Sequence, residues 1–469
     1  FGEDNILYSN VLTNIINWEQ IYNYSIHKRR YYRPTNESEI MNVIINNTNA
    51  NNIRVMGKGK SSAYVYSNDS IIIDMSNYAK NIEPKIFPNS SLCIDDNNEC
   101  LGIVSVYTSW TVMELNDYLI KRGYMIRGYS FNQDITIGGA LGSCTIGNLY
   151  NGKPLGYYLI QAWIIDGNGE DKQYSVHNSN DAEYMSSIRC NLGLLGLVYK
   201  VSIELYPVSL VQRKYNDNNI DNIGALQMWH PYKNGYDNVI WVNSDSNIND
   251  VNGYIDEYNN NNKSKRGYTQ FFNYMVTPVS CVIPDVMNLG TKILSKSKDS
   301  FTFISEPETL SVYGIQKQAY FVTHLMYFIP NEYYRSVFMN ELKDIFMEYK
   351  NTAYIVNLMV SQINKTVNIQ RKSYLGYDNN DCHVIFIELN SCSTARVDII
   401  YDIQDLILKY NGVNHWGLNW LFNDNNIESL YNNINTYFNE SLSEFINIEN
   451  ELDMDNVFMS KYYRTIFDN

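Results

Sequence analysis

Along residues 1–207 the hydrophobic positions recur at two different spacings, which predict helices and strands in turn. Ile40 and Ile44 fall on one face of a helix, and Asn36 with Glu39 forms the capping box that would begin it. Helices and strands are therefore expected to alternate up to about residue 210. Strands are predicted at 53–55, 71–73, 162–165 and 197–205, and two further helices are predicted at 111–119 and 181–188.

The composition changes after Pro207, so a domain boundary is expected near residue 208. Segments rich in Asn and Asp then separate aromatic strands and helices, and they lie at 216–222, 243–252 and 259–262. Strands are predicted at 354–360 and 384–389, followed by helices at 397–409 and within 421–469.

Charge and hydropathy exclude two classes of partner. The chain has 36 Lys and Arg against 50 Asp and Glu, a formal charge of −14 and a pI near 4.9. Nucleic-acid binding needs a clustered basic surface, so no nucleic-acid partner is expected. The longest apolar run, 319–329, is interrupted by Thr323 and His324 and falls short of the roughly 18 residues of a membrane span.

Tyr numbers 41 and Asn is more frequent still. AT-rich codons encode both residues, so an AT-biased genome such as that of a virus or a protist is expected. The sequence begins with Phe1 rather than Met, which indicates a processed or trimmed chain.

Seven cysteines leave at least one without an intramolecular partner. Cys93 and Cys100 flank a predicted hairpin and could form a disulfide, or they could be two unpaired thiols. Cys144 could pair with Cys190. The spacing of Cys and His predicts no metal site. Asn-x-Ser/Thr sequons favour a secreted or particle-surface glycoprotein over a cytoplasmic one, and they lie at Asn36, Asn46, Asn68, Asn89, Asn262, Asn364 and Asn439.

Gly57 to Ser61 follows a predicted strand and has the residue types of a phosphate-binding turn. A Walker A loop would need glycine at the position of Arg54, and a Rossmann fingerprint would need it at Ser62, so both fail. The remaining interpretation is a nest of backbone N–H groups around a pyrophosphate oxygen, and the alternative is a turn that binds nothing. Further glycine-rich segments at 136–147 and 192–196 favour the nest, because several such loops suit a long dinucleotide.

Short motifs follow one another in order along nearly the whole chain. They are Asn17-Trp18, Arg33-Pro34, Arg54 to Ser61, Thr136 to Ala140, Thr145 to Gly147, Leu192 to Gly196, Pro207, His415-Trp416-Gly417 and Asp453 to Phe458. As an ordered set they resemble the FAD-linked oxidase superfamily with the vanillyl-alcohol-oxidase or PCMH-type fold. Within that superfamily the likeness is to the branch of sugar-lactone and alditol oxidases.

The resemblance implies an FAD-binding domain of two α+β subdomains at 1–207, a cap domain with an antiparallel sheet at 208–420, and a helical return at 421–469. It also implies FAD as the cofactor, with hydride passing from an alcohol carbon to flavin N5. The residues implied to bind FAD are Gly57, Lys58, Gly59, Lys60, Ser61, Ser62, Ile137, Gly138, Gly139, Ser143, Thr145, Gly147, Gly196 and Val198.

The chain departs from the family pattern at positions that carry chemistry. Flavinylated relatives have a histidine where this chain has Lys60, so FAD is expected to be non-covalent. Ile146 replaces a usual histidine, and Leu418 replaces a usual lysine. Alignment of the cap puts Gln362 and Asn364 at a Glu and an Arg position that face the flavin, and neither residue can supply the lost base or charge.

Two residues are further candidates for catalysis. Glu388 lies in an apolar strand and could be a base with a raised pKa, or it could point to solvent from an edge strand. His415 could cover the flavin or a substrate, or it could be a packed, hydrogen-bonded histidine.

Two functions of different classes follow. The first is an FAD-dependent oxidoreductase that takes a sugar-like small-molecule substrate and passes electrons to O₂ or another acceptor. The second is a catalytically degenerate structural or surface protein, such as a virion coat component, that keeps the oxidase fold. The sequence allows a homo-oligomer in either case.

Overall fold

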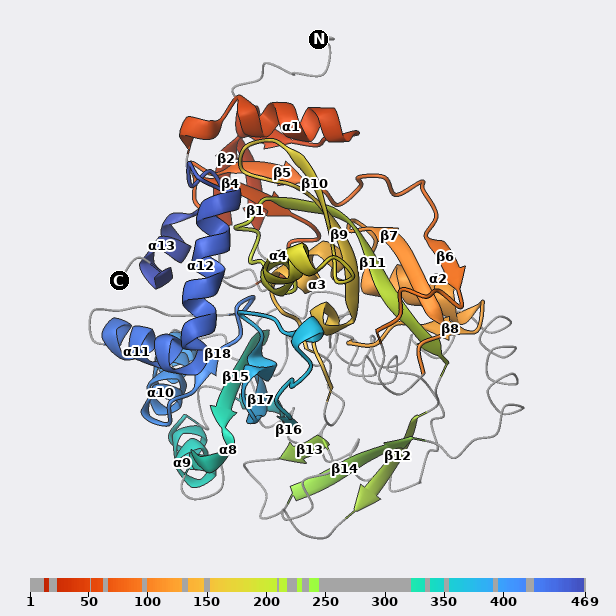
Figure 1. Ribbon diagram of the computed structural model, residues 1–469. Helices are drawn as coiled ribbons and strands as arrows, with labels where there is room; N and C mark the ends of the chain where they lie inside the picture. Colours follow the sequence, from red (N-terminus) through yellow and green to blue (C-terminus); the bar gives the residue numbers. More distant parts are fainter. Residues whose placement is uncertain are drawn as a thin grey trace.

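The computed structural model describes residues 12–16, 23–50, 52–61, 66–94, 99–128, 134–146, 152–208, 211–216, 226–229, 236–243, 322–333, 338–349, 354–390, 395–418 and 426–467. Helices and sheets are mixed throughout these ranges (Figure 1), so the predicted α+β class is confirmed. No helix in the described ranges is both long enough and apolar enough to cross a lipid bilayer.

A parallel sheet near the start of the chain consists of β3 (Tyr31–Tyr32), β5 (Ile71–Asp74) and β4 (Ile53–Met56), in that order. It follows an antiparallel pair, β1 (Leu12–Ile16) and β2 (Asn23–His27). Helix α1 (Glu37–Ile45) is capped by the side chain of Asn36, as expected. Its buried face, Ile40 and Ile44, packs with Ile53 of β4 in one apolar cluster, which fixes the helix on the sheet.

A second, antiparallel sheet has the strand order β10-β9-β11-β7-β6, with β8 paired to the end of β11. Its strands are β6 (Lys85–Pro88), β7 (Gly102–Tyr107), β8 (Tyr124–Met125), β9 (Leu159–Ile165), β10 (Asp171–Ser175) and β11 (Leu197–Pro207). The connections carry α2 (Val112–Ile120), α3 (Ile137–Gly142) and α4 (Ala182–Ile188). Thr111 and Glu114 form the predicted capping box of α2.

The third sheet is antiparallel, as expected for a cap, with the order β12-β14-β13-β16-β17-β15-β18. Its strands are β12 (Val211–Asn216), β13 (Leu226–Trp229), β14 (Tyr236–Asn243), β15 (Val322–Pro330), β16 (Tyr354–Ile363), β17 (Cys382–Asn390) and β18 (Val413–Asn414). The helices that follow its strands are α8 (Asn331–Tyr333), α9 (Met339–Glu348) and α10 (Ala395–Lys409).

The two faces of this cap sheet serve different cores. Leu325, Tyr327 and Ile329 of β15 are buried in a cluster with residues of α9 and α10. Met326 and Phe328, between them in sequence, belong to the large core of the N-terminal sheets. Because alternate residues of a strand point to opposite faces, the even-numbered positions of β15 face the rest of the chain.

The C-terminal helices return to the N-terminal sheets. They are α11 (Ile427–Phe438), α12 (Glu440–Leu452) and α13 (Lys461–Phe467), and α12 lies against α4 (Figure 1). Ile53 N–H donates a hydrogen bond to the Val457 carbonyl at 2.8 Å. The buried carboxylate of Asp453 accepts hydrogen bonds from the N–H groups of Val457 and Phe458 at 2.8 and 2.7 Å. This path agrees with the predicted helical return, while the two domain boundaries, after residues 207 and 420, stay a prediction.

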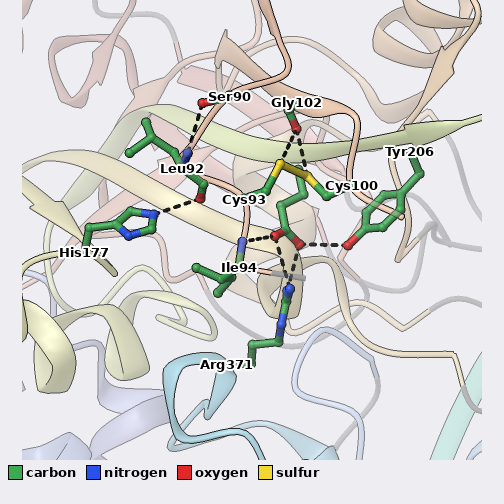
Figure 2. Close-up of a disulfide and its surroundings, with 10 residues drawn as sticks. Ser90, Leu92, Cys93, Ile94, Cys100, Gly102, His177, Tyr206 and Arg371 are labelled. Atoms are coloured by element: carbon green, nitrogen blue, oxygen red, sulfur yellow. Dashed lines mark hydrogen bonds and ion pairs between the residues drawn. A yellow bond between two sulfur atoms is a disulfide. The ribbon is translucent and has the colours of Figure 1, made fainter. Parts of the chain in front are cut away.

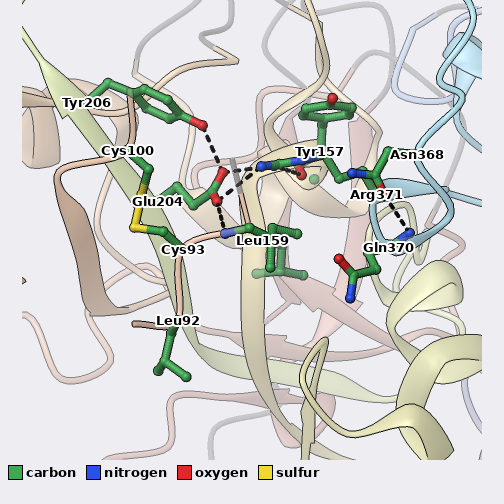
Figure 3. Close-up of polar contacts among 12 residues, drawn as sticks. Leu92, Cys93, Cys100, Tyr157, Leu159, Glu204, Tyr206, Asn368, Gln370 and Arg371 are labelled. Carbon is green, nitrogen blue, oxygen red and sulfur yellow. Dashed lines mark hydrogen bonds and ion pairs between the residues drawn. A yellow bond between two sulfur atoms is a disulfide. The ribbon is translucent and has the colours of Figure 1, made fainter. Parts of the chain in front are cut away.

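A buried ion pair ties the segment between β16 and β17 to β11 (Figure 3). Arg371 donates hydrogen bonds to the fully buried carboxylate of Glu204 at 2.8 and 3.1 Å and to the Tyr157 carbonyl at 3.1 Å. The Tyr206 hydroxyl and the Ile94 N–H donate to the same carboxylate at 2.8 and 2.9 Å. A carboxylate with this many donors is satisfied, so Glu204 is an anchor of the fold.

Cys93 and Cys100 form a disulfide beside this ion pair (Figure 2), so the alternative of two unpaired thiols is wrong. The suggested bond between Cys144 and Cys190 is also wrong, because both are buried free thiols and their side chains are hydrogen-bonded to each other. Burial raises the pKa of the Cys190 thiol well above its usual range, so it stays protonated.

Candidate functional site

A large pocket lies where the glycine-rich loops, the cap sheet and the C-terminal part of the chain meet. It encloses about 1490 Å³ of empty space, part of it open to solvent. The first loop supplies Gly57, Lys58, Gly59, Lys60 and Ser61; the second supplies Gly138, Gly139, Gly142, Ser143, Thr145 and Ile146; the third supplies Asn191, Leu192, Gly193, Gly196 and Val198. The structure therefore brings three loops that are far apart in sequence to one cavity.

The first loop begins where β4 ends and bends at Gly59. The φ of Gly59 is +63°, a left-handed conformation that favours glycine, and a Cβ there would meet no atom within 4 Å. A Cβ on Gly57 would occupy the space of Thr136 Oγ1 and lie 3.0 Å from Thr136 Cγ2. The first loop therefore needs glycine at one position to turn, and at another to approach the second loop.

Side chains of the first loop connect it to other walls of the pocket. Lys60 Nζ forms an ion pair with Asp134 at 3.0 Å. The Ser61 hydroxyl donates a hydrogen bond to the Gly417 carbonyl at 2.8 Å, across more than three hundred positions of sequence. Both contacts hold the loop against segments that close the cavity.

The second loop runs through α3. Thr136 caps this helix by accepting a hydrogen bond from Gly139 N–H at 3.1 Å, and Ser143 Oγ donates to the Gly139 carbonyl at 2.9 Å. Ile137, predicted to bind the cofactor, does not line the pocket, because α3 turns its side chain into the core, where it is fully buried. Cys144, although it lies between two lining residues, is also turned into the core.

Arg54 holds the third loop in place through hydrogen bonds to its backbone. Its buried guanidinium donates hydrogen bonds to the carbonyls of Leu192, Gly193 and Phe458 at 2.9, 3.3 and 2.7 Å. Burial lowers the pKa of Arg54 from its ordinary value, although the residue stays charged near neutral pH. Gly196 has a φ of +122°, and a Cβ there would meet the backbone of β9, so this turn also requires glycine.

Two predicted cofactor-binding residues, Ser62 and Gly147, lie outside the described residues. The predicted residues that do line the pocket are Gly57, Lys58, Gly59, Lys60, Ser61, Gly138, Gly139, Ser143, Thr145, Gly196 and Val198. Among the described residues, no group of three or more His, Cys, Asp or Glu side chains could hold a metal ion.

His415 lines the pocket beside Trp416, Gly417 and Leu418. Its ring stacks near Tyr377, and its Nδ1 accepts a hydrogen bond from Gly417 N–H at 3.0 Å, which leaves the proton of the neutral ring on Nε2. Burial lowers the pKa of His415 to about 3, although a hydrogen bond with the Cys144 backbone acts in the opposite direction. His415 is therefore a packed, neutral hydrogen-bond donor at physiological pH and is poorly suited to accept a proton.

The cap sheet contributes His324, Met326 and Phe386 to the pocket, and sequence reasoning missed all three. The sequence did contain a signal, because His324 breaks the apolar run of 319–329. The interruption argues against a membrane span, but a polar residue inside a buried strand is also a candidate site residue.

Three other residues of the cap were predicted to bear on catalysis: Glu388, Gln362 and Asn364. β17 lies between β15 and β16, so the idea that Glu388 points to solvent from an edge strand is wrong; the side chain itself lies outside the described residues. Gln362 and Asn364, aligned with the catalytic pair of the family, do not line the pocket. Asn364 is exposed, so its sequon does not conflict with a substrate cavity.

The architecture identifies the class of protein to which the chain is similar. It superposes on a solvent-stable cholesterol oxidase with a TM-score of 0.67 and 11% identity, covering 97% of both chains. It also superposes on cholesterol oxidase from B. sterolicum with a TM-score of 0.65 and 11% identity, covering 98% of this chain and 97% of the other. The fold is thus the PCMH-type fold of FAD-linked oxidases.

Sequence similarity narrows the class to a branch. The chain is 22% identical to L-gulonolactone oxidase of Mus musculus over 262 residues, 55% of this chain and 54% of that protein. It is 22% identical to D-arabinono-1,4-lactone oxidase of Eremothecium gossypii over 231 residues, 49% of this chain and 39% of that protein. The chain thus spans about half the length of the curated relatives it matches, or less. No protein-family model matches it. Together the likenesses support an FAD-linked oxidase of the sugar-lactone branch.

Proposed function

We propose that the protein is an FAD-dependent oxidoreductase that holds FAD non-covalently and oxidises an alcohol carbon of a sugar-like lactone or alditol. The observation that carries the proposal is the convergence of three glycine-rich loops and the cap sheet on one pocket. Bound FAD would accept a hydride and its two electrons from the substrate, and O₂ or another acceptor would take them on.

The residues present fit this cofactor. The open space beside Gly59 allows a pyrophosphate to approach the backbone N–H groups of the first loop closely. Three glycine-rich loops line the same pocket, so an extended dinucleotide could contact all of them. Ser61, Ser143 and Thr145 supply hydroxyl groups along the same wall. The chain's own part is therefore to bind and orient the cofactor and to exclude water from it.

Non-covalent attachment is supported by the first loop. Lys60 stands at the position of the flavin-linking histidine of relatives, and its ammonium group is paired with Asp134 at 3.0 Å. The second loop offers no thiol, because Cys144 packs in the core with Cys190. Nothing in the described residues or in the similar proteins supports the alternative of a catalytically degenerate surface protein.

Purification and acid precipitation test the proposal. We expect a yellow protein that absorbs near roughly 370 and 450 nm and releases all of its flavin into the acid supernatant. Flavin that stays with the precipitate would refute non-covalent attachment. A colourless protein that FAD cannot reconstitute would refute the oxidoreductase. Anaerobic bleaching by L-gulono-1,4-lactone, D-arabinono-1,4-lactone and a panel of alditols then identifies the substrate class.

We further propose that the protein is glycosylated and secreted or displayed on a surface. Sequon asparagines whose burial the structure describes include Asn36, Asn46, Asn68, Asn89, Asn364 and Asn439, and these six are exposed. The Cys93–Cys100 disulfide suits an oxidising compartment. Treatment of protein from its native source with peptide N-glycosidase should lower its mass; an unchanged mass would contradict glycosylation.

A further inference from the structure

Three neighbouring strands of the cap sheet, β15, β17 and β16, lie beside the pocket, and their paired residues form rows across the sheet. In one row His324 of β15 pairs with Glu388 of β17, which pairs with Asn357 of β16. In the next row Met326 pairs with Phe386, which pairs with Met359. A row of polar residue types therefore lies next to an apolar row.

His324 is the member of the polar row whose side chain the structure describes. It is 3% exposed, lines the pocket, and stacks on Phe386 with ring centroids 5.7 Å apart and ring planes 25° apart. Met326 and Phe386, each 5% exposed, line the same wall. These contacts fix the imidazole in the cap wall of the pocket.

Alcohol oxidation requires a group that accepts a proton. An alcohol that loses a hydride from carbon must also lose its hydroxyl proton, and a general base typically raises the rate by about 10²–10⁴-fold. Histidine is the residue whose ordinary pKa suits this task near neutral pH. His415, the other lining imidazole, is less suited because its accepting nitrogen, Nδ1, already accepts a hydrogen bond from the Gly417 N–H, which leaves the ring proton on Nε2.

We propose that His324 is the catalytic base that accepts the hydroxyl proton of the alcohol substrate. The inference rests on the proposed oxidoreductase function and assigns a residue to it. In the reaction the substrate C–H bond breaks, the hydride goes to the bound flavin, the O–H bond breaks, and the proton goes to the imidazole. The carbon–oxygen single bond becomes a carbonyl. The substrate loses two electrons, the flavin gains them, and the acceptor of the proposed function restores the oxidised flavin.

Sulfite tests the position of His324 without any knowledge of the substrate. Sulfite adds reversibly to N5 of oxidised flavin, the atom that accepts the hydride, and it bleaches the absorbance near about 450 nm. An imidazole beside the substrate position can donate a hydrogen bond to the anionic adduct. The full-length FAD-loaded protein is compared with His324→Gln and with the control His383→Gln. His383 is equally buried in β17, but it has the strand parity of Ile385, on the helix-covered face, and does not line the pocket.

We expect His324→Gln to retain flavin, to bind sulfite about tenfold or more weakly than wild type, and to turn over L-gulono-1,4-lactone about 10²–10⁴-fold more slowly. His383→Gln should match wild type in both measurements. If wild type does not oxidise the lactone, sulfite binding alone decides. If His324→Gln does not fold, His324→Asn replaces it.

Sulfite binding and turnover of His324→Gln within about threefold of the His383→Gln values would overturn the role of His324 and leave the oxidoreductase standing. Absence of flavin from wild type after reconstitution would overturn the oxidoreductase itself, and the role of His324 with it. The two failures are distinguishable because flavin content is measured before sulfite is added.

Discussion

The contact between the first two glycine loops predicts that Gly57→Ala weakens FAD binding. The added Cβ would occupy the space of Thr136 Oγ1 and lie 3.0 Å from Thr136 Cγ2. Thr136 is 3% exposed and caps α3 through Gly139 N–H, so it has little room to move. Either the threonine rotates and the cap is lost, or the first loop moves away from the second.

The two responses have similar magnitudes. Loss of an N-cap hydrogen bond costs about 0.5–2 kcal/mol, and overpacking of a buried contact costs about 1–3 kcal/mol. We therefore expect the free energy of unfolding to fall by about 1–3 kcal/mol. If the displacement weakens FAD binding by the same free energy, FAD affinity falls by about 10- to 100-fold, since each 1.4 kcal/mol is a factor of ten.

Titration of the apoprotein with FAD, followed by flavin fluorescence, measures the affinity, and urea unfolding measures the stability. Gly123→Ala is the matched control. Gly123, unlike Gly57, has a positive φ, +80°, but a Cβ there meets no atom within 4 Å and the residue does not line the pocket. It should lose about 1 kcal/mol of stability from the left-handed backbone and retain wild-type FAD affinity.

A double variant tests the cause. Gly57→Ala with Thr136→Ala removes Thr136 Oγ1 and Cγ2, the two atoms nearest the new Cβ, so the two substitutions should be less than additive in FAD affinity. FAD affinity of Gly57→Ala within about twofold of wild type would refute the close approach of the two loops as a requirement of the site.

Three further predictions concern stability and attachment. Arg371→Met leaves the buried Glu204 carboxylate without its partner and should lower the free energy of unfolding by about 3–5 kcal/mol in urea, whereas a loss below about 1 kcal/mol would contradict the anchor role. His415 has a folded-state pKa of about 3 against an ordinary 6.5, so the unfolded chain binds the proton first as pH falls. Its contribution to stability is complete above pH 6.5 and should fall by about 2 kcal/mol by pH 5, a slope that His415→Asn should remove in urea unfolding at both pH values. Lys60→His should allow flavin to remain with the acid precipitate, and a folded variant that binds no flavin would count against the site.

The glycine loops could be predicted from the sequence because their requirements are local. The left-handed φ of Gly59 and the backbone contact behind Gly196 are properties of single positions that only glycine satisfies. A capped helix such as α1 is local in the same sense, since Asn36 and Ile40 are neighbours along the chain. Ile137 shows the limit: it was predicted to bind the cofactor together with its neighbour Gly138, yet α3 places its side chain in the core.

The cap wall could not be predicted because it depends on pairing between distant strands. His324 and Glu388 meet only through the register of β15 with β17, across a separation that no local pattern encodes. The sequence alone also does not distinguish a disulfide from two free thiols at Cys93 and Cys100, because both states are compatible with a hairpin. Register is set by the burial of whole strands, and a shift of one residue would turn every side chain to the other face.

Strand parity also explains why Gln362, which the resemblance aligns with a catalytic glutamate, does not line the pocket. Ser361 of β16 pairs with Val384, which faces the N-terminal core, whereas Gln362 pairs with His383, which has the opposite parity. An alignment shifted by one residue would place Ser361 and Ile363 toward the pocket side, and neither can act as a base. Residues 361–364 of the chain include no ionisable side chain, so neither alignment supplies a base there. The proton acceptor that we propose therefore comes from another strand of the cap. β15 meets that condition with His324, at the register position opposite the one acidic residue of β17.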